Sequence, residues 1–186
     1  LLFHAAFTYS FFLKAIAGLN PITFFKKMKD VVLFAFSTSS SAATIPVTLK
    51  TANQDLGVNQ NVASFVVPVG ATINMDGTAI MQGLATVFIA QMSGIDLTLF
   101  QYIQVVLLAV ATSIGTAAVP SAGTITLIII LQQFNLPLEA IGIILAVDRV
   151  LDMIRTSVNV TGDAAIACIV AKTENQLDEN IFNSKT

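Results

Sequence analysis

The sequence is poor in charge and in reactive side chains. Asp, Glu, Lys and Arg make up 11% of its 186 residues, against roughly 25% in ordinary soluble domains. The net charge is −2 and no basic tract occurs, so neither nucleic acid nor an anionic lipid surface is indicated as a partner. A single cysteine, Cys168, excludes an intrachain disulfide, and the single histidine, His4, belongs to no recognisable motif.

What the sequence has instead is apolar surface. Hydrophobic residues make up 55% of the chain, the mean hydropathy is +0.80, and residues 97–138 contain no charged side chain. A helix needs about 20 apolar residues to cross the roughly 30 Å of a bilayer core. Residues 1–13 lack the basic start and cleavage site of a signal peptide, so they read as the end of a membrane helix. We therefore expect a fragment of a longer multi-pass protein of the cell membrane (the inner membrane, if it is bacterial), in contact with the lipid bilayer.

One polar stripe interrupts the apolar residues 140–171. At about 100° per residue, the five side chains Asp152, Arg155, Thr156, Asn159 and Asp163 fall within one arc of about 100° on a helix. A charged group in lipid costs roughly 2.5–3.5 kcal/mol, so the stripe must face protein or a water-filled cavity. Oxygen-rich groups of both signs suit a zwitterion and hard cations.

The helical segments are interrupted at unusual places. We expect helices at residues 23–36, 47–54, 62–90, 99–114, 124–134 and 140–172, and a loose polar tail at 173–186. The helices on either side of the serine-rich run 37–46 and of the turn 115–123 are too short to span a bilayer, which indicates two re-entrant hairpins. Near the middle of 62–90, Asp76 follows Asn74, where an opened backbone must line a site.

The two halves of the chain repeat one pattern. The segments 41–46 (SAATIP) and 115–120 (GTAAVP) are both hairpin tips of small residues closed by proline, and each precedes a long helix with an intramembrane acid, Asp76 or Asp152. Such paired interruptions are typical of secondary transporters. The predicted fold is an all-α membrane protein, with two re-entrant helical hairpins and two long, partly broken transmembrane helices in a pseudo-repeat.

The polar residues suggest which ligands they hold. Asp76 and Asp163 offer oxygen without nitrogen or sulfur, which suits an alkali or alkaline-earth cation. Asp152 can hold an ammonium group, and Arg155 offers the planar donor fork that a carboxylate accepts.

These motifs together resemble one family. The segment NMDGT at 74–78, the serines at 39–41, the tip at 115–123 and the stripe of 152–163 resemble the dicarboxylate/amino acid:cation symporters, which include the glutamate and aspartate transporters. The resemblance implies that residues 1–172 form a transport domain: the end of helix 6, hairpin 1, helix 7, hairpin 2 and helix 8. It also implies a polar tail at 173–186, an N-terminal scaffold absent from the chain, and a homotrimer in which transport domains move like elevators.

The resemblance also assigns residues to an acidic amino acid substrate. The α-carboxylate would meet the Ser41 backbone and Asn159; the ammonium would meet Asp152, Thr156 and the carbonyls of Ser39 and Val119; the side-chain carboxylate would meet Arg155, Thr78 and Gly123.

Sodium ions would occupy three further places. One would lie among Asp163 and the carbonyls of Gly70, Asn74 and Asn159; a second among the carbonyls of Thr72, Ser113, Ile114 and Thr116; a third at Asp76 and Asn74, with its other ligands from the absent N-terminal part.

Other functions remain open from the sequence. The function expected is sodium-driven import of glutamate or aspartate rather than an enzyme activity, and Arg155 favours acidic substrates. Gln82 stands where proton-coupled relatives have a glutamate, while Arg149 is placed to reach the space that an arginine fills in some relatives. Alternatives are a proton-coupled dicarboxylate or neutral amino acid symporter, an ion channel, and an intramembrane aspartyl protease. The protease needs two acids that share a proton, whereas Arg155 would keep Asp152 ionised.

Overall fold

The computed structural model describes residues 1–184, and every regular element in this part of the chain is helical. The elements are the π-helix η1 (His4–Tyr9), α1 (Ser10–Ala15), α2 (Pro21–Lys27), α3 (Lys29–Thr38), α4 (Ser41–Gln54), α5 (Gln60–Ile73), α6 (Asp76–Met92), α7 (Leu99–Ile114), α8 (Ala122–Gln133), the 3-10 turn η2 (Leu138–Ala140), α9 (Ile141–Thr173) and α10 (Glu179–Asn183). An isolated bridge pairs Val58 with Leu177. The all-α prediction is confirmed.

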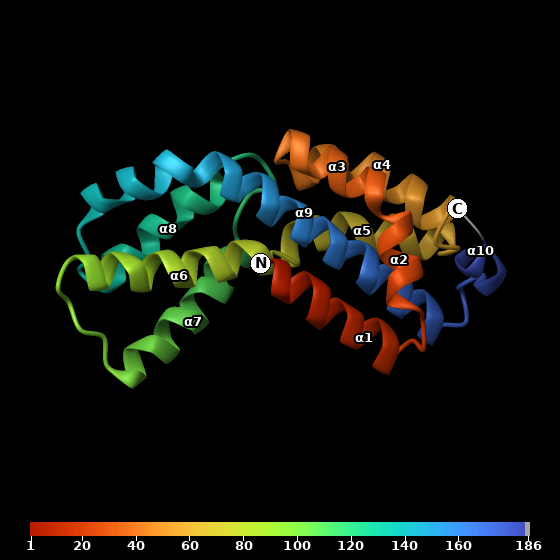
Figure 1. Ribbon diagram of the computed structural model, residues 1–186, viewed down its shortest axis with the longest axis horizontal. Coiled ribbons are helices and arrows are strands. Elements are labelled where there is room, and N and C mark those ends of the chain that lie inside the picture. The colour runs from red at the N-terminus through yellow and green to blue at the C-terminus, as the bar shows by residue number, and fades with distance from the viewer. Residues whose placement is uncertain (185–186) are drawn as a thin grey trace.

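Helix α9 runs through both halves of the elongated molecule (Figure 1). Its 33 residues extend about 50 Å. The first part of α9 packs with α6 and α8 around Ile89, Leu127 and Ile144, and the second part packs with α1 to α5 around Phe24 and Val160. Side chains from two separate apolar cores therefore meet on one continuous helix.

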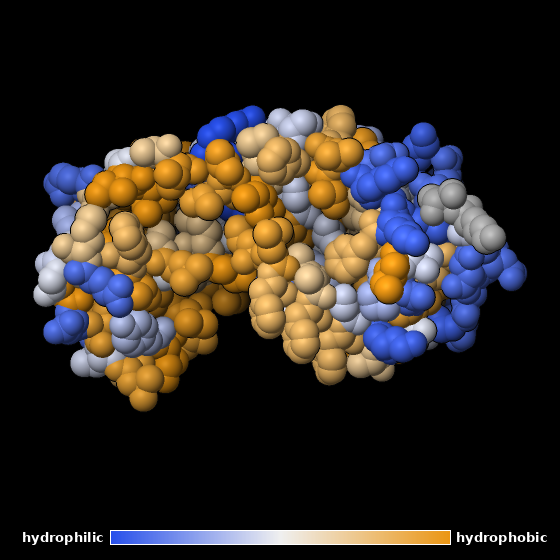
Figure 2. Space-filling model, in the orientation of Figure 1, coloured by the Kyte–Doolittle hydropathy of each residue, from blue (hydrophilic) through white to orange (hydrophobic). Residues whose placement is uncertain are grey.

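The surface separates by polarity along the long axis. Figure 2 shows mostly hydrophobic residues over the middle of this face and hydrophilic residues gathered at its two ends. Within residues 1–184, none of the helices combines the length and the apolar character that a membrane crossing requires.

The first hairpin begins earlier than the sequence predicted. The expected helix 23–36 is two helices, α2 and α3, which meet at Met28; Asn20 caps α2 by accepting from the Ile22 N–H. The prediction that the second half starts after Pro46 is wrong, because α4 already begins at Ser41 and contains the proline. A proline removes one helical hydrogen bond, and here the cap that Ser40 provides to the Ala43 N–H starts the helix ahead of it.

The other breaks fall where the sequence placed them. The expected segment 62–90 is α5 and α6, which are separated at Asn74 and Met75 by non-helical backbone. The second hairpin consists of α7 and α8, and Thr98 and Gln101 form a capping box at its start. Two polar or flexible residues in an apolar run are thus enough to locate a break.

The predicted loose tail is instead docked on the fold. The Asp178 N–H donates to the Gly57 carbonyl (2.8 Å), and Phe182 is completely buried. The Lys27 ammonium, itself 5% exposed, donates to the carbonyls of Asp55 and Ile181. Tail, α2 and the α4–α5 turn are therefore held together at one end of the molecule.

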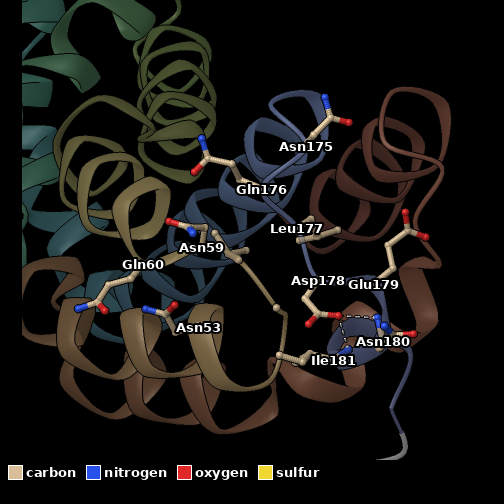
Figure 3. Close-up of a pocket in the computed structure, with 12 residues that line it drawn as sticks. Asn53, Asn59, Gln60, Asn175, Gln176, Leu177, Asp178, Glu179, Asn180 and Ile181 are labelled. Atoms are coloured by element: carbon tan, nitrogen blue, oxygen red, sulfur yellow. Dashed lines mark hydrogen bonds between the residues drawn. The ribbon is translucent and has the colours of Figure 1, made fainter.

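A polar pocket lies beside this docked tail. Figure 3 shows amide and carboxylate side chains from the α4–α5 turn and from the tail around it, Asn59 and Asn175 among them. Its volume is about 810 Å³. The pocket lies at the C-terminal end of α4, about 20 Å along the helix from Ser41, and no residue predicted for substrate or sodium lines it.

The tail docking predicts different effects for two glycines. Gly57 and Gly94 both have left-handed backbone, with φ of +72° and +68°. A Cβ at Gly57 would clash with the Asp178 carbonyl oxygen, while one at Gly94 would meet no atom of residues 1–184 within 4 Å. We expect Gly94→Ala to cost about 1 kcal/mol of stability from backbone strain, and Gly57→Ala to cost at least about 2 kcal/mol because the tail also undocks. Thermal unfolding in detergent and amide hydrogen exchange of the tail measure this. Equal effects of the two substitutions would contradict the docking.

Candidate binding site between the hairpin tips

The two hairpin tips touch each other. The Ala118 carbonyl accepts from the Ser40 hydroxyl (2.9 Å) and from the Ala42 N–H (3.2 Å). Each tip holds one serine with left-handed backbone, Ser39 (φ 52°) in the first and Ser121 (φ 60°) in the second. A non-glycine residue in this region is strained, and such strain concentrates at ligand sites and switches.

A small cavity lies beneath this contact. The lining includes every residue that the family resemblance assigned to the substrate: Ser39, Ser41, Thr78, Val119, Gly123, Asp152, Arg155, Thr156 and Asn159. They come from both tips, from α6 and from α9. The cavity volume is about 10 Å³, which is about the room that one water molecule needs. An amino acid can enter only if a wall moves.

A buried arginine lies between two carboxylates at one side of the cavity. Arg155 is 1% exposed, and its Nε donates to Asp152 Oδ1 (2.9 Å) while Nη1 lies 3.1 Å from Asp148 Oδ1. Asp148 also accepts from the Thr124 hydroxyl at 2.6 Å. Removing one partner from such a buried network leaves an uncompensated charge, which typically costs 3–5 kcal/mol.

The guanidinium has donors to spare. Within residues 1–184, neither Nη1 nor Nη2 makes a hydrogen bond, because the approach of Nη1 to Asp148 lacks hydrogen-bond geometry. The buried Ser39 hydroxyl has no partner in this part of the chain either. Buried polar groups in proteins are nearly always paired. Arg155 and Ser39 both line the cavity, so their unused donors lie beside it.

Other predicted binding groups are bonded within the protein. Asp152 Oδ2 accepts from the Ser121 N–H (2.8 Å), and Asn159 Oδ1 accepts from the Gly77 N–H (2.7 Å). The Asn159 amide also approaches the Thr78 hydroxyl at 3.4 Å. In the closed form, backbone N–H groups therefore hold the two side chains that were predicted to meet the ammonium and the α-carboxylate.

The residues of the first predicted sodium site lie close together. The Asn74 amide donates to Asp163 Oδ1 (2.9 Å) and to the Asn159 carbonyl (3.3 Å). Gly70 lies so close that a Cβ there would be 2.6 Å from Asp163 Oδ1. Asp163 is 2% exposed and has no cationic partner among residues 1–184. A buried carboxylate surrounded by carbonyl and amide groups fits a hard cation.

The second predicted set is less complete. Ser113, Ile114 and Thr116 lie together at the end of α7, but the Ser113 carbonyl accepts from the N–H groups of Gly115 and Thr116. Thr72 is exposed on α5, and its hydroxyl donates to its own helix at Val69. In the part of the chain that the structure describes, no hydrogen bond joins Thr72 to the α7 residues, so this set stays a prediction.

The third predicted site has partners that sequence reasoning missed. Asp76 Oδ2 lies 3.0 Å from His4 Nε2 and 3.2 Å from the Tyr9 hydroxyl. The two residues lie 72 and 67 positions from Asp76 in the sequence. No spacing rule connects them, and only the lone histidine in an apolar segment was a signal.

Two residues that flank the polar stripe in the sequence, Asp148 and Arg149, differ in their surroundings. Asp148 lies seven residues before Arg155 and hence on the same helix face, as the periodicity predicts. Arg149 is exposed, so it does not reach the cavity as the sequence suggested.

Gln82 is fully buried and joins both halves of the second hairpin, since its amide donates to the Gly123 carbonyl (3.0 Å) and accepts from the Thr112 hydroxyl (2.9 Å).

The chain is similar in sequence to known transporters. Human excitatory amino acid transporter 2 is 48% identical over 151 residues, which cover 81% of this chain and 26% of that protein. A Caenorhabditis elegans excitatory amino acid transporter is 47% identical over 151 residues, which cover 81% of this chain and 30% of that protein. Rat excitatory amino acid transporter 1 is 43% identical over 170 residues, with 91% and 31% covered. The chain therefore spans about a quarter to a third of the length of these relatives. The model of the sodium:dicarboxylate symporter family matches residues 1–173, and the chain belongs to this family.

Proposed function

We propose that this chain is the substrate-carrying part of a transporter that imports an acidic amino acid together with sodium ions. The observation that carries the proposal is Arg155, a fully buried guanidinium with unused donors beside the Asp152 carboxylate in one cavity. Relatives named excitatory amino acid transporters support it.

The charges of the cavity complement such a substrate. An acidic amino acid carries one ammonium and two carboxylates. Asp152 matches the ammonium, while Arg155 has donors left for the side-chain carboxylate. The helix that begins at Ser41 presents N–H groups to the α-carboxylate, beside Asn159. A neutral amino acid has no second carboxylate, so it would leave the remaining donors of the buried guanidinium without a partner.

Sodium coupling follows from the neighbouring acid. Asp163 is buried and hydrogen-bonded to Asn74, so a bound cation would supply the positive partner that the buried carboxylate lacks. Asn159 belongs to both predicted sites: its side chain lines the cavity and its carbonyl contacts Asn74. A shared residue allows each ligand to favour the other, and such coupling is reciprocal.

The remaining parts of the proposal concern the whole protein. Residues 1–172 are proposed as a transport domain with re-entrant hairpins that moves like an elevator in the cell membrane, within a homotrimer whose scaffold lies outside this chain. The hydrophilic ends and apolar middle of the surface in Figure 2 support a molecule that sits in a bilayer. Helix α9, which enters both cores, supports motion of the domain as one body.

The structure favours this proposal over its alternatives. Gln82 has neutral partners at both its oxygen and its nitrogen, so a proton carrier at this position is not supported. An aspartyl protease needs two carboxyl groups that share a proton, but the Arg155 guanidinium lies between the carboxylates of Asp148 and Asp152, at 3.1 Å and 2.9 Å.

Sodium should control substrate binding. We expect the affinity for aspartate to rise as sodium rises over a hundredfold range, because the two ligands share Asn159. Isothermal titration of the intact, purified protein measures this, with potassium at equal ionic strength as the control. A constant affinity over that range would exclude the coupling, as would uptake into liposomes driven equally well by a proton gradient without sodium.

Arg155 should determine specificity. Arg155→Cys removes the partner of the substrate's second carboxylate, and such a loss typically costs 2–5 kcal/mol. The binding affinity for acidic substrates should therefore fall by at least about tenfold to a hundredfold relative to that for serine or alanine. Competition against labelled substrate measures the ratio. The matched control is Arg149→Cys, which removes an exposed arginine from the same helix and should leave the ratio unchanged. An unchanged ratio in Arg155→Cys would make this arginine a structural charge only.

The second hairpin should act as the lid. The cavity is too small for substrate, and residues 115–121 at the tip are mostly exposed and held by few contacts. Spin labels at Val119 and at Leu84 on α6 should give a distance distribution that narrows when sodium and aspartate are both added. A control pair at Ala43 and Phe65 reports on the first hairpin, whose base the tail holds. Identical Val119–Leu84 distributions with and without ligands would contradict a lid.

A further inference from the structure

The first helical turn of the chain has an unusual shape. Residues His4–Tyr9 form a π-helix, which is closed by hydrogen bonds five residues apart and is frequently found at functional sites. In an α-helix, residues five apart point about 140° away from each other. In this wider turn, the rings of His4 and Tyr9 lie edge to face with centroids 5.1 Å apart. The π turn therefore brings both side chains to one side.

Both side chains contact a single carboxylate oxygen. Asp76 Oδ2 lies 3.0 Å from His4 Nε2 and 3.2 Å from the Tyr9 hydroxyl oxygen. Tyr9 is 4% exposed, so its hydroxyl has no solvent partner to replace this contact. Asp76 begins α6 directly after the break at Asn74 and Met75, where the backbone is not helical.

The Tyr9 hydroxyl has a second acceptor in reach. Its oxygen is 3.2 Å from the Val158 carbonyl on α9 as well as 3.2 Å from Asp76 Oδ2. A hydroxyl carries one proton and two lone pairs. When the Tyr9 hydroxyl donates its proton to the Val158 carbonyl, one of its lone pairs is free on the Asp76 side. The same hydroxyl can therefore donate to Asp76 when no cation is bound, or offer its neutral oxygen to a cation beside Asp76.

A glycine makes room for this arrangement. A Cβ at Gly162 would lie 2.5 Å from the Asn74 amide nitrogen and 2.6 Å from the Tyr9 hydroxyl. The Tyr9 hydroxyl and the Asn74 side chain therefore both rest against bare backbone of α9. Asn74 in turn donates to Asp163 and precedes Asp76 by two residues, so Tyr9 lies beside a residue that was predicted for both cation sites.

We propose that Tyr9 supplies its hydroxyl oxygen to the cation held at Asp76, and that the π turn exists to place it there. The inference rests on the sodium coupling proposed above. Carboxylate, amide and hydroxyl oxygens are the ligands that hard cations prefer. The helical segment His4–Tyr9 of this chain then contributes a ligand to this site.

The test removes one oxygen atom. Tyr9→Phe keeps the ring and loses the hydroxyl, and the matched control is Tyr102→Phe on α7, whose side chain is 37% exposed. In the intact protein, we expect Tyr9→Phe to raise the sodium concentration needed for half-maximal aspartate binding by about tenfold, the effect of one lost contact to a charged group. Affinity for aspartate at saturating sodium should stay within about twofold of wild type. Tyr102→Phe should match wild type in both.

Two further readouts separate a ligand from a structural contact. The ratio of lithium to sodium half-saturation should change in Tyr9→Phe, because a lost ligand alters the size of the site. The rise in Tm on adding sodium alone should shrink, whereas a variant that is merely less stable keeps the same rise from a lower start. Unchanged sodium dependence and cation ratio in Tyr9→Phe overturn the inference. Absence of sodium dependence in the wild type itself would instead overturn the proposed function.

Discussion

The burial of one positive charge constrains the arrangement of the site. Burying a guanidinium away from water is costly unless carboxylates lie beside it. Arg155 is buried between the carboxylates of Asp148 and Asp152, which belong to its own helix. These acids need further donors in turn, which the second hairpin provides through Thr124 and the Ser121 N–H. The charge on α9 thus fixes where the second hairpin lies when the site is closed.

The residues of the candidate site were easier to predict than the contacts between them. The stripe on α9 could be found because helical periodicity puts its members on one face, and the break before Asp76 because Asn74 interrupts an apolar run. The nine substrate residues assigned through the family resemblance all line one cavity. Their roles in binding remain predictions, as does the sodium set that includes Thr72.

The errors have physical causes that the local sequence does not contain. Pro46 looked like a helix start, but the cap at Ser40 and packing against α3 and α5 keep the backbone helical through it. The tail looked loose because it is polar, yet backbone pairing at Gly57 and burial of Phe182 dock it. The contact of Tyr9 with Asp76 depends on a π turn, for which the sequence has no known signature.

The left-handed serine at the second tip affects how readily the site opens. Ser121 keeps φ at 60° while its N–H holds Asp152, and this conformation costs an L-residue roughly 1–2 kcal/mol. If the tip opens and Ser121 relaxes to an unstrained conformation, this energy is regained. It offsets much of the free energy that is lost with the hydrogen bond from Ser121 to Asp152. Each 1.4 kcal/mol changes a population ratio tenfold. The strain at Ser121 therefore lowers the free energy that is needed to break its contact with Asp152 and move the second tip away.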